Sequence, residues 1–325
     1  MSFFQPAPGT VLSHDIADYP DGIVLPIDKP YRWTSADVIR KVKFAAFRHF
    51  RKKNLKVGHA GTLDPLATGV LLVCLGPACK RAQEFQDHDK EYVANIRFGA
   101  TTPSYDLEKE VDRTFPYDQV TEEAVRAVLP SFLGPQEQVA PLFSAKSVDG
   151  VRAYEMARKL YRNAQKGILD PDFDAAALET LHRSRITISD LELLDFVEAF
   201  DAVEASAETP RTNFFSPEKR SMKFCPTPDA DAACTQTVIS SGAEGGVEKS
   251  ASSRINVADT SSLGLPEARI RIACSKGTYI RAFARDLGEA LGTGAHLSSL
   301  VRTKTGAFRL EDALSLEEAL ALLAD

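Results

Sequence analysis

Apolar and polar residues alternate in three stretches of the chain, and this pattern predicts β-strands. The stretches are residues 92–98, 185–188 and 269–272, where every second side chain would face a core. Residues 70–75, Val-Leu-Leu-Val-Cys-Leu, form an unbroken apolar run that predicts a further strand. An extended piece at residues 22–27 is expected to lead into the first helix.

Residues with helical spacing follow Thr34 and Ser35, either of which can cap a helix. Apolar residues at 38, 39, 42, 45 and 46 would form its buried face. Further helices are expected at 80–85, 121–132, 152–161 and 278–291, and a capping-box pattern at 315–318 predicts a short closing helix. Because helices and strands are interspersed without a regular βαβ period, the chain is predicted to have an α+β fold with a mixed sheet.

Residues 200–266 differ from the rest of the chain in composition. They are rich in Ser, Ala, Thr, Asp, Glu and Pro and contain the run SSGAEGG at 240–246. Few large apolar side chains are therefore present to offset the entropy of ordering. We expect a disordered insertion, placed between two strands that remain neighbours in the sheet.

The composition is that of a globular protein with a substantial core, since 44% of the 325 residues are hydrophobic. No apolar run approaches the roughly 18 residues of a membrane span, and the N-terminus lacks a basic flank followed by an apolar block. The five cysteines include no CxxC pair, so neither a disulfide framework nor a zinc knuckle is indicated. A cytoplasmic protein without a metal is the resulting expectation.

Positive charge is concentrated in two segments, although the formal net charge is -6. Residues 28–56 carry ten Lys or Arg against two Asp, and residues 269–309 carry eight against two acids. A basic face of this kind can bind a polyanion through salt-sensitive phosphate contacts. For residues 48–56, RHFRKKNLK, a solvated helix face is an equally good interpretation, although the aromatic groups could also stack on bases.

One carboxylate, Asp64, lies in the glycine-rich stretch GHAGTLDPLATGV at residues 58–70. The proline after it disfavours helical backbone angles at Asp64, and the glycines let a ligand or another backbone come close. This arrangement suits a catalytic acid presented by a loop. The alternative is an Asx turn in which Asp64 only caps its own backbone, and the local sequence alone favours that alternative.

A second stretch, CSKGTYIRAFARDLG at residues 274–288, joins a predicted strand to a predicted helix through a small turn. Its backbone N–H groups, together with Lys276 and Arg281, could bind an anion. Taken alone, the stretch could be an ordinary phosphate or carboxylate site, and Tyr279 could be a core residue.

Together the two stretches resemble the TruB-type tRNA pseudouridine synthases, which isomerise the T-loop uridine at tRNA position 55 without a cofactor. The resemblance extends over four blocks in the order of the family, at residues 27–35, 58–80, 138–158 and 275–303. It implies the pseudouridine synthase fold, a mixed and mainly antiparallel sheet flanked by helices and loops.

By this resemblance, Asp64, Tyr92 and Arg281 are the catalytic residues. Asp64 matches the aspartate that adds to C6 of the uracil or attacks C1′ of the ribose, after which the base is detached, turned and rejoined through C5. Tyr92 matches the tyrosine that stacks on the flipped base and removes the C5 proton, although an aromatic residue on an alternating strand is also a common core residue. Arg281 matches the arginine that pairs with the aspartate and keeps it ionised.

The resemblance also implies how tRNA is bound. Tyr279 and Leu300 match residues of the uracil pocket, and His59 matches the histidine that enters the T loop beside the flipped base. The residues expected to contact phosphate or substrate are Lys29, Lys80, Arg152, Lys276 and Arg302. The family pattern implies tRNA as partner, without a cofactor, a metal, a membrane or an obligatory protein partner.

The catalytic domain is expected to span residues 23–325, after an N-terminal tail at 1–22 and around the 200–266 insertion. After the last family block the chain leaves no room for the RNA-binding PUA domain that many members carry. Weaker or differently distributed tRNA binding is therefore expected. Residues 101–106, TTPSYD, depart from the acidic TDT-like segment of many relatives, so no contacts are carried over for them.

Two other functions stay open on the sequence. A guide-RNA-dependent rRNA pseudouridine synthase resembles this chain in the catalytic blocks, but it depends on partner proteins and usually has a PUA domain. A tRNA-folding chaperone is the second, because Asp64, Tyr92 and Arg281 argue only against a purely non-catalytic role.

Overall fold

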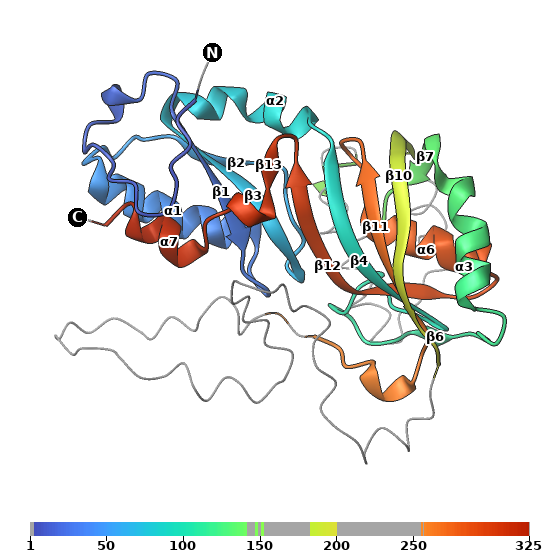
Figure 1. Ribbon diagram of the computed structural model, residues 1–325. Coiled ribbons are helices and arrows are strands. Elements are labelled where there is room, and N and C mark those ends of the chain that lie inside the picture. The colour runs from blue at the N-terminus through green and yellow to red at the C-terminus, as the bar shows by residue number, and fades with distance from the viewer. Residues whose placement is uncertain are drawn as a thin grey trace, which may run out of the picture. The chain divides into compact units, whose positions relative to one another are not determined.

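A computed structural model describes residues 3–141, 147–148, 151–152, 183–199, 255 and 257–324 of the chain, and the structural statements below concern these residues. Its main sheet is mixed and mainly antiparallel (Figure 1). The strands follow one another across the sheet as β1 (Ile23–Lys29), β3 (Ala67–Leu75), β12 (Ala295–Thr305), β4 (Lys90–Phe98), β11 (Glu267–Cys274), β10 (Arg183–Val197) and β7 (Gly134–Val139).

Two further strands extend this sheet. β2 (Val57–Ala60) pairs with β3, and β13 (Phe308–Arg309) pairs with β12. The β3–β12 pair is parallel, whereas β1–β3, β12–β4, β4–β11, β11–β10 and β10–β7 are antiparallel. The predicted α+β class with a mixed sheet is therefore confirmed. Two small pairs lie outside the main sheet, β5 (Ala100–Thr101) with β6 (Arg113–Thr114) and β8 (Ser147–Val148) with β9 (Val151–Arg152).

The described helices are α1 (Ser35–His49), α2 (Ala82–Asp87), α3 (Glu122–Val128), α6 (Ile280–Ala290) and α7 (Leu316–Ala321). Short 3-10 segments are η1 (Ile16–Asp18), η2 (Gly76–Arg81), η3 (Leu129–Phe132), η7 (Ser261–Leu263) and η8 (Leu310–Asp312). None of these helices combines the length and the apolar composition needed to cross a lipid bilayer.

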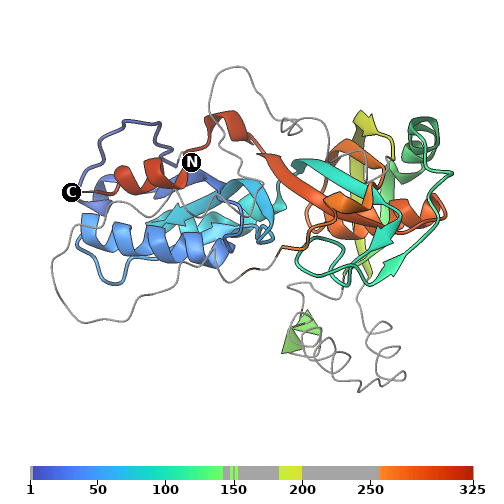
Figure 2. The ribbon, with the colours of Figure 1, turned by 90° about the horizontal axis from the view of Figure 1, so that it is seen from below.

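Helix α1 begins at the predicted capping residue. Thr34 Oγ1 accepts a hydrogen bond from the Asp37 backbone N–H (3.1 Å), and the Asp37 carboxylate accepts one from the Thr34 N–H (3.1 Å), which closes a capping box. The apolar side of the helix, with Val38, Val42 and Ala46, is buried. Helix α7 packs beside α1 and against β1 (Figure 2).

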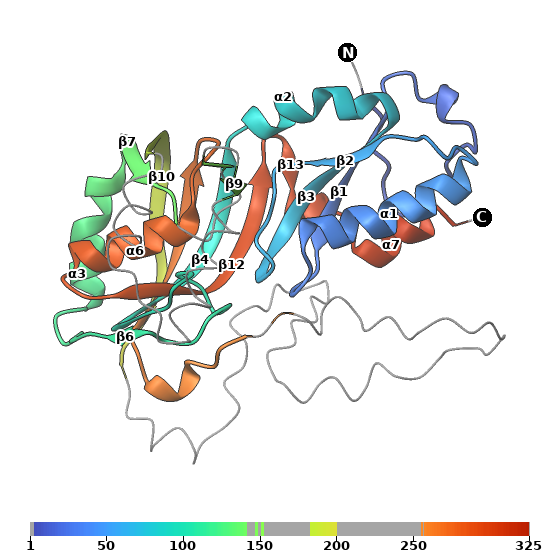
Figure 3. The ribbon, with the colours of Figure 1, turned by 180° about the vertical axis from the view of Figure 1, so that it is seen from behind.

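Strand β3 is buried on both faces, which explains its unbroken apolar sequence. Leu71 and Val73 belong to the large core cluster, whereas Leu72 and Cys74 belong to a second cluster with Phe85 of α2. In contrast, β11 alternates strictly between buried and half-buried residues, as predicted. Helix α6 covers the large core by packing against β12 and β4 (Figure 3).

Residues 3–22, predicted to be a tail, are instead part of the domain. The Phe4 N–H donates to Gly22 O (3.1 Å), the Val24 N–H donates to Phe4 O (2.9 Å), and Leu12 and Ile16 are buried. The sequence did not reveal this because the segment joins the sheet edge through backbone hydrogen bonds, which require no periodic side-chain pattern.

The predicted insertion ends earlier than residue 266. Residues 200–254 and 256 lie outside the described residues, but 257–266 are described and packed. The Ala258 N–H donates to Leu107 O (2.8 Å), and both Ala258 and Leu265 are buried. The strands on either side, β10 and β11, are antiparallel neighbours, as predicted for an expanded hairpin connection. The predicted helix at 152–161 lies outside the described residues from 153 onward.

Candidate active site

Asp64 lies in the loop of residues 61–66 that connects β2 to β3. Helix α1 holds this loop, because Ser35 Oγ donates to Leu63 O (3.2 Å) and accepts from the Leu63 N–H (3.0 Å). At the start of β3, a Cβ on Gly69, where φ is 100°, would lie 2.2 Å from the Arg302 carbonyl oxygen, so only glycine fits. The predicted non-helical placement of Asp64 is confirmed.

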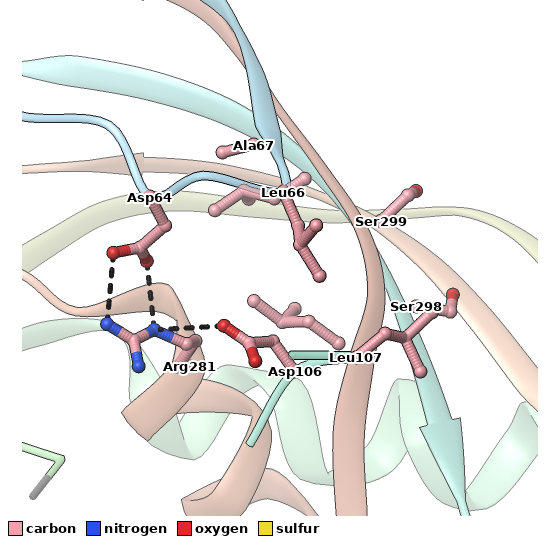
Figure 4. A pocket seen from close by; sticks show the side chains of 10 residues that line it. Asp64, Leu66, Ala67, Asp106, Leu107, Arg281, Ser298 and Ser299 are labelled. Atoms are coloured by element: carbon pink, nitrogen blue, oxygen red, sulfur yellow. Dashed lines mark hydrogen bonds and ion pairs between the residues drawn. The ribbon is translucent and has the colours of Figure 1, made fainter. Parts of the chain in front are cut away.

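The carboxylate of Asp64 forms a bidentate ion pair with Arg281, the second residue of α6 (Figure 4). Arg281 Nε donates to Asp64 Oδ2 (2.9 Å) and the guanidinium NH2 donates to Asp64 Oδ1 (3.0 Å). The Arg281 side chain is 6% exposed and that of Asp64 is 35% exposed. The carboxylate is thus oriented by a buried cation and remains accessible to a ligand.

Two carboxyl groups beside Arg281, Asp106 and Glu108, were not predicted as site residues. Asp106 Oδ2 lies 3.6 Å from Arg281 Nε. Asp106 Oδ1 accepts hydrogen bonds from Ser104 Oγ (2.6 Å) and the Glu108 N–H (3.0 Å). The available sequence signal was Asp106 at the end of the segment 101–106, which departs from the family pattern, followed two residues later by Glu108.

Burial and mutual repulsion govern the protonation of this cluster. Burial raises the pKa of Asp106, and burial together with the charge of Asp106 raises the pKa of Glu108 to about 7. Burial by itself lowers the pKa of Arg281, but Asp64 and Asp106 outweigh it and raise that pKa overall. One permanently charged guanidinium therefore faces three carboxyl groups.

A pocket opens beside the ion pair. Its apolar wall comes from Leu66, Leu107, Leu297 and Leu300, and its charged edge comes from Asp64, Asp106 and Arg281 (Figure 4). Ala67, Ser298 and Ser299 complete the lining. Apolar walls with a few placed charged groups are typical of small-molecule binding sites.

Two family models match the chain. Residues 48–167 match the TruB family pseudouridylate synthase (N terminal domain), and residues 281–325 match the tRNA pseudouridylate synthase B C-terminal domain. A tRNA pseudouridine synthase B of Phocaeicola vulgatus is 39% identical over 300 residues, which cover 92% of this chain and 92% of that protein. This chain belongs to the TruB pseudouridylate synthase family. A tRNA pseudouridine synthase B of Bacteroides thetaiotaomicron is 41% identical over 300 residues, again 92% of each chain.

The fold agrees with this family. A chain of a crystallised Cbf5–Nop10–Gar1 complex superposes with a TM-score of 0.50 at 21% identity, covering 93% of this chain and 54% of that chain. The TruB-family chain thus spans about half the length of that structural match. Both the TruB resemblance and the pseudouridine synthase fold inferred from the sequence are confirmed.

Three residues that the TruB resemblance assigned to the base occupy different positions. Leu300 lines the pocket. Tyr279 is half-buried at the N-cap of α6, where its N–H donates to Gln138 Oε1 (2.8 Å) and its carbonyl accepts from Gln138 Nε2 (3.1 Å). Tyr92 is 8% exposed within the core cluster and does not line the pocket. Burial raises the pKa of Tyr92, whereas the charge of Arg302 lowers it.

Lys29 and Arg302, predicted to contact phosphate or substrate, have buried side chains in the TruB fold. Lys29 Nζ donates to the carbonyls of Pro30 (2.9 Å), Trp33 (2.6 Å) and Pro65 (3.1 Å). Arg302 donates through Nε to Val70 O (2.7 Å) and through NH2 to Gly61 O (3.1 Å). Burial lowers the pKa of Lys29 to about 7, with the charge of Asp64 acting in the opposite direction. Both cations bind carbonyl groups of or near the loop that carries Asp64 and are buried, and their predicted contacts with phosphate or substrate stay a prediction.

The other predicted contacts are placed as follows. His59 is half-buried on β2, its Nδ1 has no hydrogen-bond partner among the described residues, and burial lowers its pKa. Lys80 is exposed, and Lys276 is exposed and forms an ion pair with Asp87 (2.9 Å). The side chain of Arg152 lies outside the described part of the structure. In that described part, no group of three His, Cys, Asp or Glu residues is arranged to hold a metal ion.

Proposed function

We propose that this protein converts the T-loop uridine at position 55 of tRNA into pseudouridine, acting alone and without a cofactor. Membership of the TruB family and the relatives named tRNA pseudouridine synthase B support the activity. The observation that carries the proposal for the site is the two-pronged pairing of Asp64 with Arg281 at the edge of an apolar pocket.

The reaction is an isomerisation, so no atoms are gained or lost. The bond between N1 of the uracil and C1′ of the ribose breaks, a bond between C5 and C1′ forms, and the proton on C5 is lost while N1 gains one. Asp64 acts as the nucleophile, either at C6 or at C1′. Its bidentate pairing with a buried guanidinium fixes the direction from which the carboxylate approaches the uridine.

The uridine must leave the stacked loop before Asp64 can reach it. The leucine-lined pocket would then receive the uracil, with Leu300 against the ring and Arg281 beside the reacting carboxylate. Tyr92 is the proposed acceptor of the C5 proton. Its burial disfavours the phenolate, and the charge of Arg302 counteracts this effect. Because Tyr92 is almost inaccessible in this structure, this role requires the base to displace neighbouring side chains.

The tRNA contacts are assigned to cations that reach solvent. Lys80 and Lys276 are exposed, and Arg152 and the half-buried His59 remain in the proposal through the family pattern. Because its substrate would be tRNA, we place the protein in the cytoplasm. No protein partner is required in this proposal, which distinguishes it from a guide-RNA-dependent rRNA enzyme.

The test is pseudouridine formation in an unmodified tRNA transcript by the purified protein alone, with the modified position mapped. Asp64→Asn should abolish conversion and largely preserve tRNA affinity, because phosphate contacts rather than this carboxylate dominate binding. Asp118→Asn, which removes an exposed carboxylate, is the matched control and should convert tRNA normally. Normal turnover by Asp64→Asn would refute the assignment. Binding without conversion by the wild type would favour a partner-dependent enzyme or an RNA chaperone.

A further inference from the structure

The outer side of α1 and the turn after it carry a dense positive patch. All eight Lys and Arg residues between positions 40 and 56 are exposed, and together they are named the α1 surface. Residues 35–56 include a single acid, Asp37, which is buried and paired with Arg40 (3.1 Å). In a chain with a formal net charge of -6, this short segment is therefore strongly cationic.

Two features distinguish the α1 surface from an ordinary solvated helix face. Phe44 is 67% exposed among the cations, and the Arg48 guanidinium lies 6.0 Å from its ring centroid. Arg51 adopts φ of 48° just after the helix, where glycine is the usual residue. Solvation alone does not explain why this surface carries a large exposed aromatic ring, Phe44, and a cationic residue, Arg51, with a left-handed backbone conformation. Cations interleaved with aromatic rings are typical of nucleic-acid contacts.

The α1 helix connects the α1 surface to the loop that carries Asp64. The helix begins at Ser35, which is hydrogen-bonded to Leu63 in the catalytic loop. With 15 residues, at about 1.5 Å of rise per residue, it runs roughly 22 Å away from that loop. Figure 3 shows α1 beside the strands β1 and β3 of the sheet. Phosphates of an RNA whose loop is held at Asp64 can therefore reach the α1 surface.

We propose that the α1 surface binds the phosphates of the tRNA stem that adjoins the loop held at Asp64, with Phe44 packing on the same RNA. This inference rests on the proposed function, since it takes tRNA as the substrate. The charge of the surface complements a double row of phosphates, and its distance from Asp64 assigns it to the stem rather than to the reacting base. The α1 surface would thus supply affinity without taking part in the chemistry.

The experiment compares two variants that lose the same charge. The test variant combines Arg48→Gln, Lys52→Gln and Lys53→Gln. The control combines Arg113→Gln, Arg126→Gln and Arg183→Gln, all exposed and on β6, α3 and β10. Binding of an unmodified tRNA transcript is measured at several salt concentrations, and turnover is measured at saturating tRNA.

The test variant should bind tRNA at least tenfold more weakly, with turnover at saturation within twofold of the wild type. The slope of log affinity against log salt should become shallower by up to about 3, since each lost phosphate contact contributes about 0.9. Phe44→Ala should weaken binding several-fold and leave the slope unchanged. An unchanged affinity and slope in the test variant, or an equal loss in the control, would overturn the proposal.

Two outcomes separate this proposal from related failures. If the wild type forms no pseudouridine but the test variant alone loses tRNA affinity, the proposed function fails and the RNA surface stands. If the wild type is a dimer in solution and the test variant a monomer with full tRNA affinity, the α1 surface joins two copies of the chain and the proposal is wrong. Equal melting temperatures of wild type and variants exclude misfolding as the cause.

Discussion

Glu108 is predicted to destabilise the protein above pH 7, and Glu108→Gln should remove this effect. The carboxyl group is largely buried beside Asp106, and both interactions favour its neutral form. Its pKa rises from an ordinary value of 4.5 to about 7 in the folded state. Between these two values the folded protein binds more protons than the unfolded chain, so stability falls as pH rises.

The size of the effect follows from the shift. A difference of roughly 2.5 pH units, at about 1.36 kcal/mol per unit, corresponds to about 3 kcal/mol between pH 4 and pH 8. Part of the shift comes from repulsion between Glu108 and Asp106, so we expect ionisation of Glu108 alone to lower the free energy of unfolding by about 2 kcal/mol. A glutamine has nearly the same shape and no charge at either pH. Glu108→Gln should therefore be more stable than the wild type at pH 8, by roughly 4–6 °C in melting temperature.

The assay is thermal unfolding of the wild type and Glu108→Gln from pH 5 to pH 8. The advantage of the variant should be small at pH 5 and grow through pH 7. Glu110→Gln, which removes an exposed neighbouring carboxylate, should show no such growth. A difference between wild type and Glu108→Gln that stays constant with pH would show that Glu108 is ionised without penalty in the folded protein, and the reasoning would fail.

Three further substitutions test how the site is held. Arg281→Lys keeps the charge but loses the bidentate pairing with the Asp64 carboxylate, so single-turnover conversion should fall by about 100-fold with tRNA affinity retained; near-normal conversion would contradict this. Lys29→Met leaves three buried carbonyls without their donor and should cost about 2–4 kcal/mol in chemical denaturation; an unchanged midpoint would show that the donor is dispensable. Gly69→Ala should lower the melting temperature sharply, because its Cβ would meet Arg302 O, whereas Gly58→Ala, with open space around it, should not; equal effects would refute the steric argument.

Several elements could be predicted from the sequence because their causes are local. The capping box of Thr34 and the strict alternation of β11 need only neighbouring residues. The N-terminal segment and residues 257–266 were assigned wrongly because they are held by backbone hydrogen bonds and contacts to distant parts of the chain. Neither kind of contact has a sequence period.

In the candidate site, too, the sequence predicted the local features and missed those that depend on distant parts of the chain. The glycine-rich loop identified Asp64 as a possible catalytic acid, and the family resemblance added its pairing with Arg281, which the structure contains. The resemblance assigned Lys29 and Arg302 to contacts with phosphate or substrate, whereas both side chains are buried in the structure. The sequence shows that a residue is charged, but not whether water or protein surrounds the charge.

By itself the sequence determined several elements, among them helix α1 and the strands β3, β4 and β11, the loop that presents Asp64 and, through its four blocks, membership of the TruB family. These follow from local spacing and from motifs that are contiguous in the chain. Only the tertiary structure decided which charges meet. Arg281 pairs with Asp64, which lies 217 positions earlier in the chain, and donates a hydrogen bond to the carbonyl of Ser104, which lies 177 positions earlier. Only the folded chain brings Asp106 and Glu108 close to this pair. Their raised pKa values depend on burial and on neighbouring charges, and Asp64 and Arg281 lie far from them in the sequence.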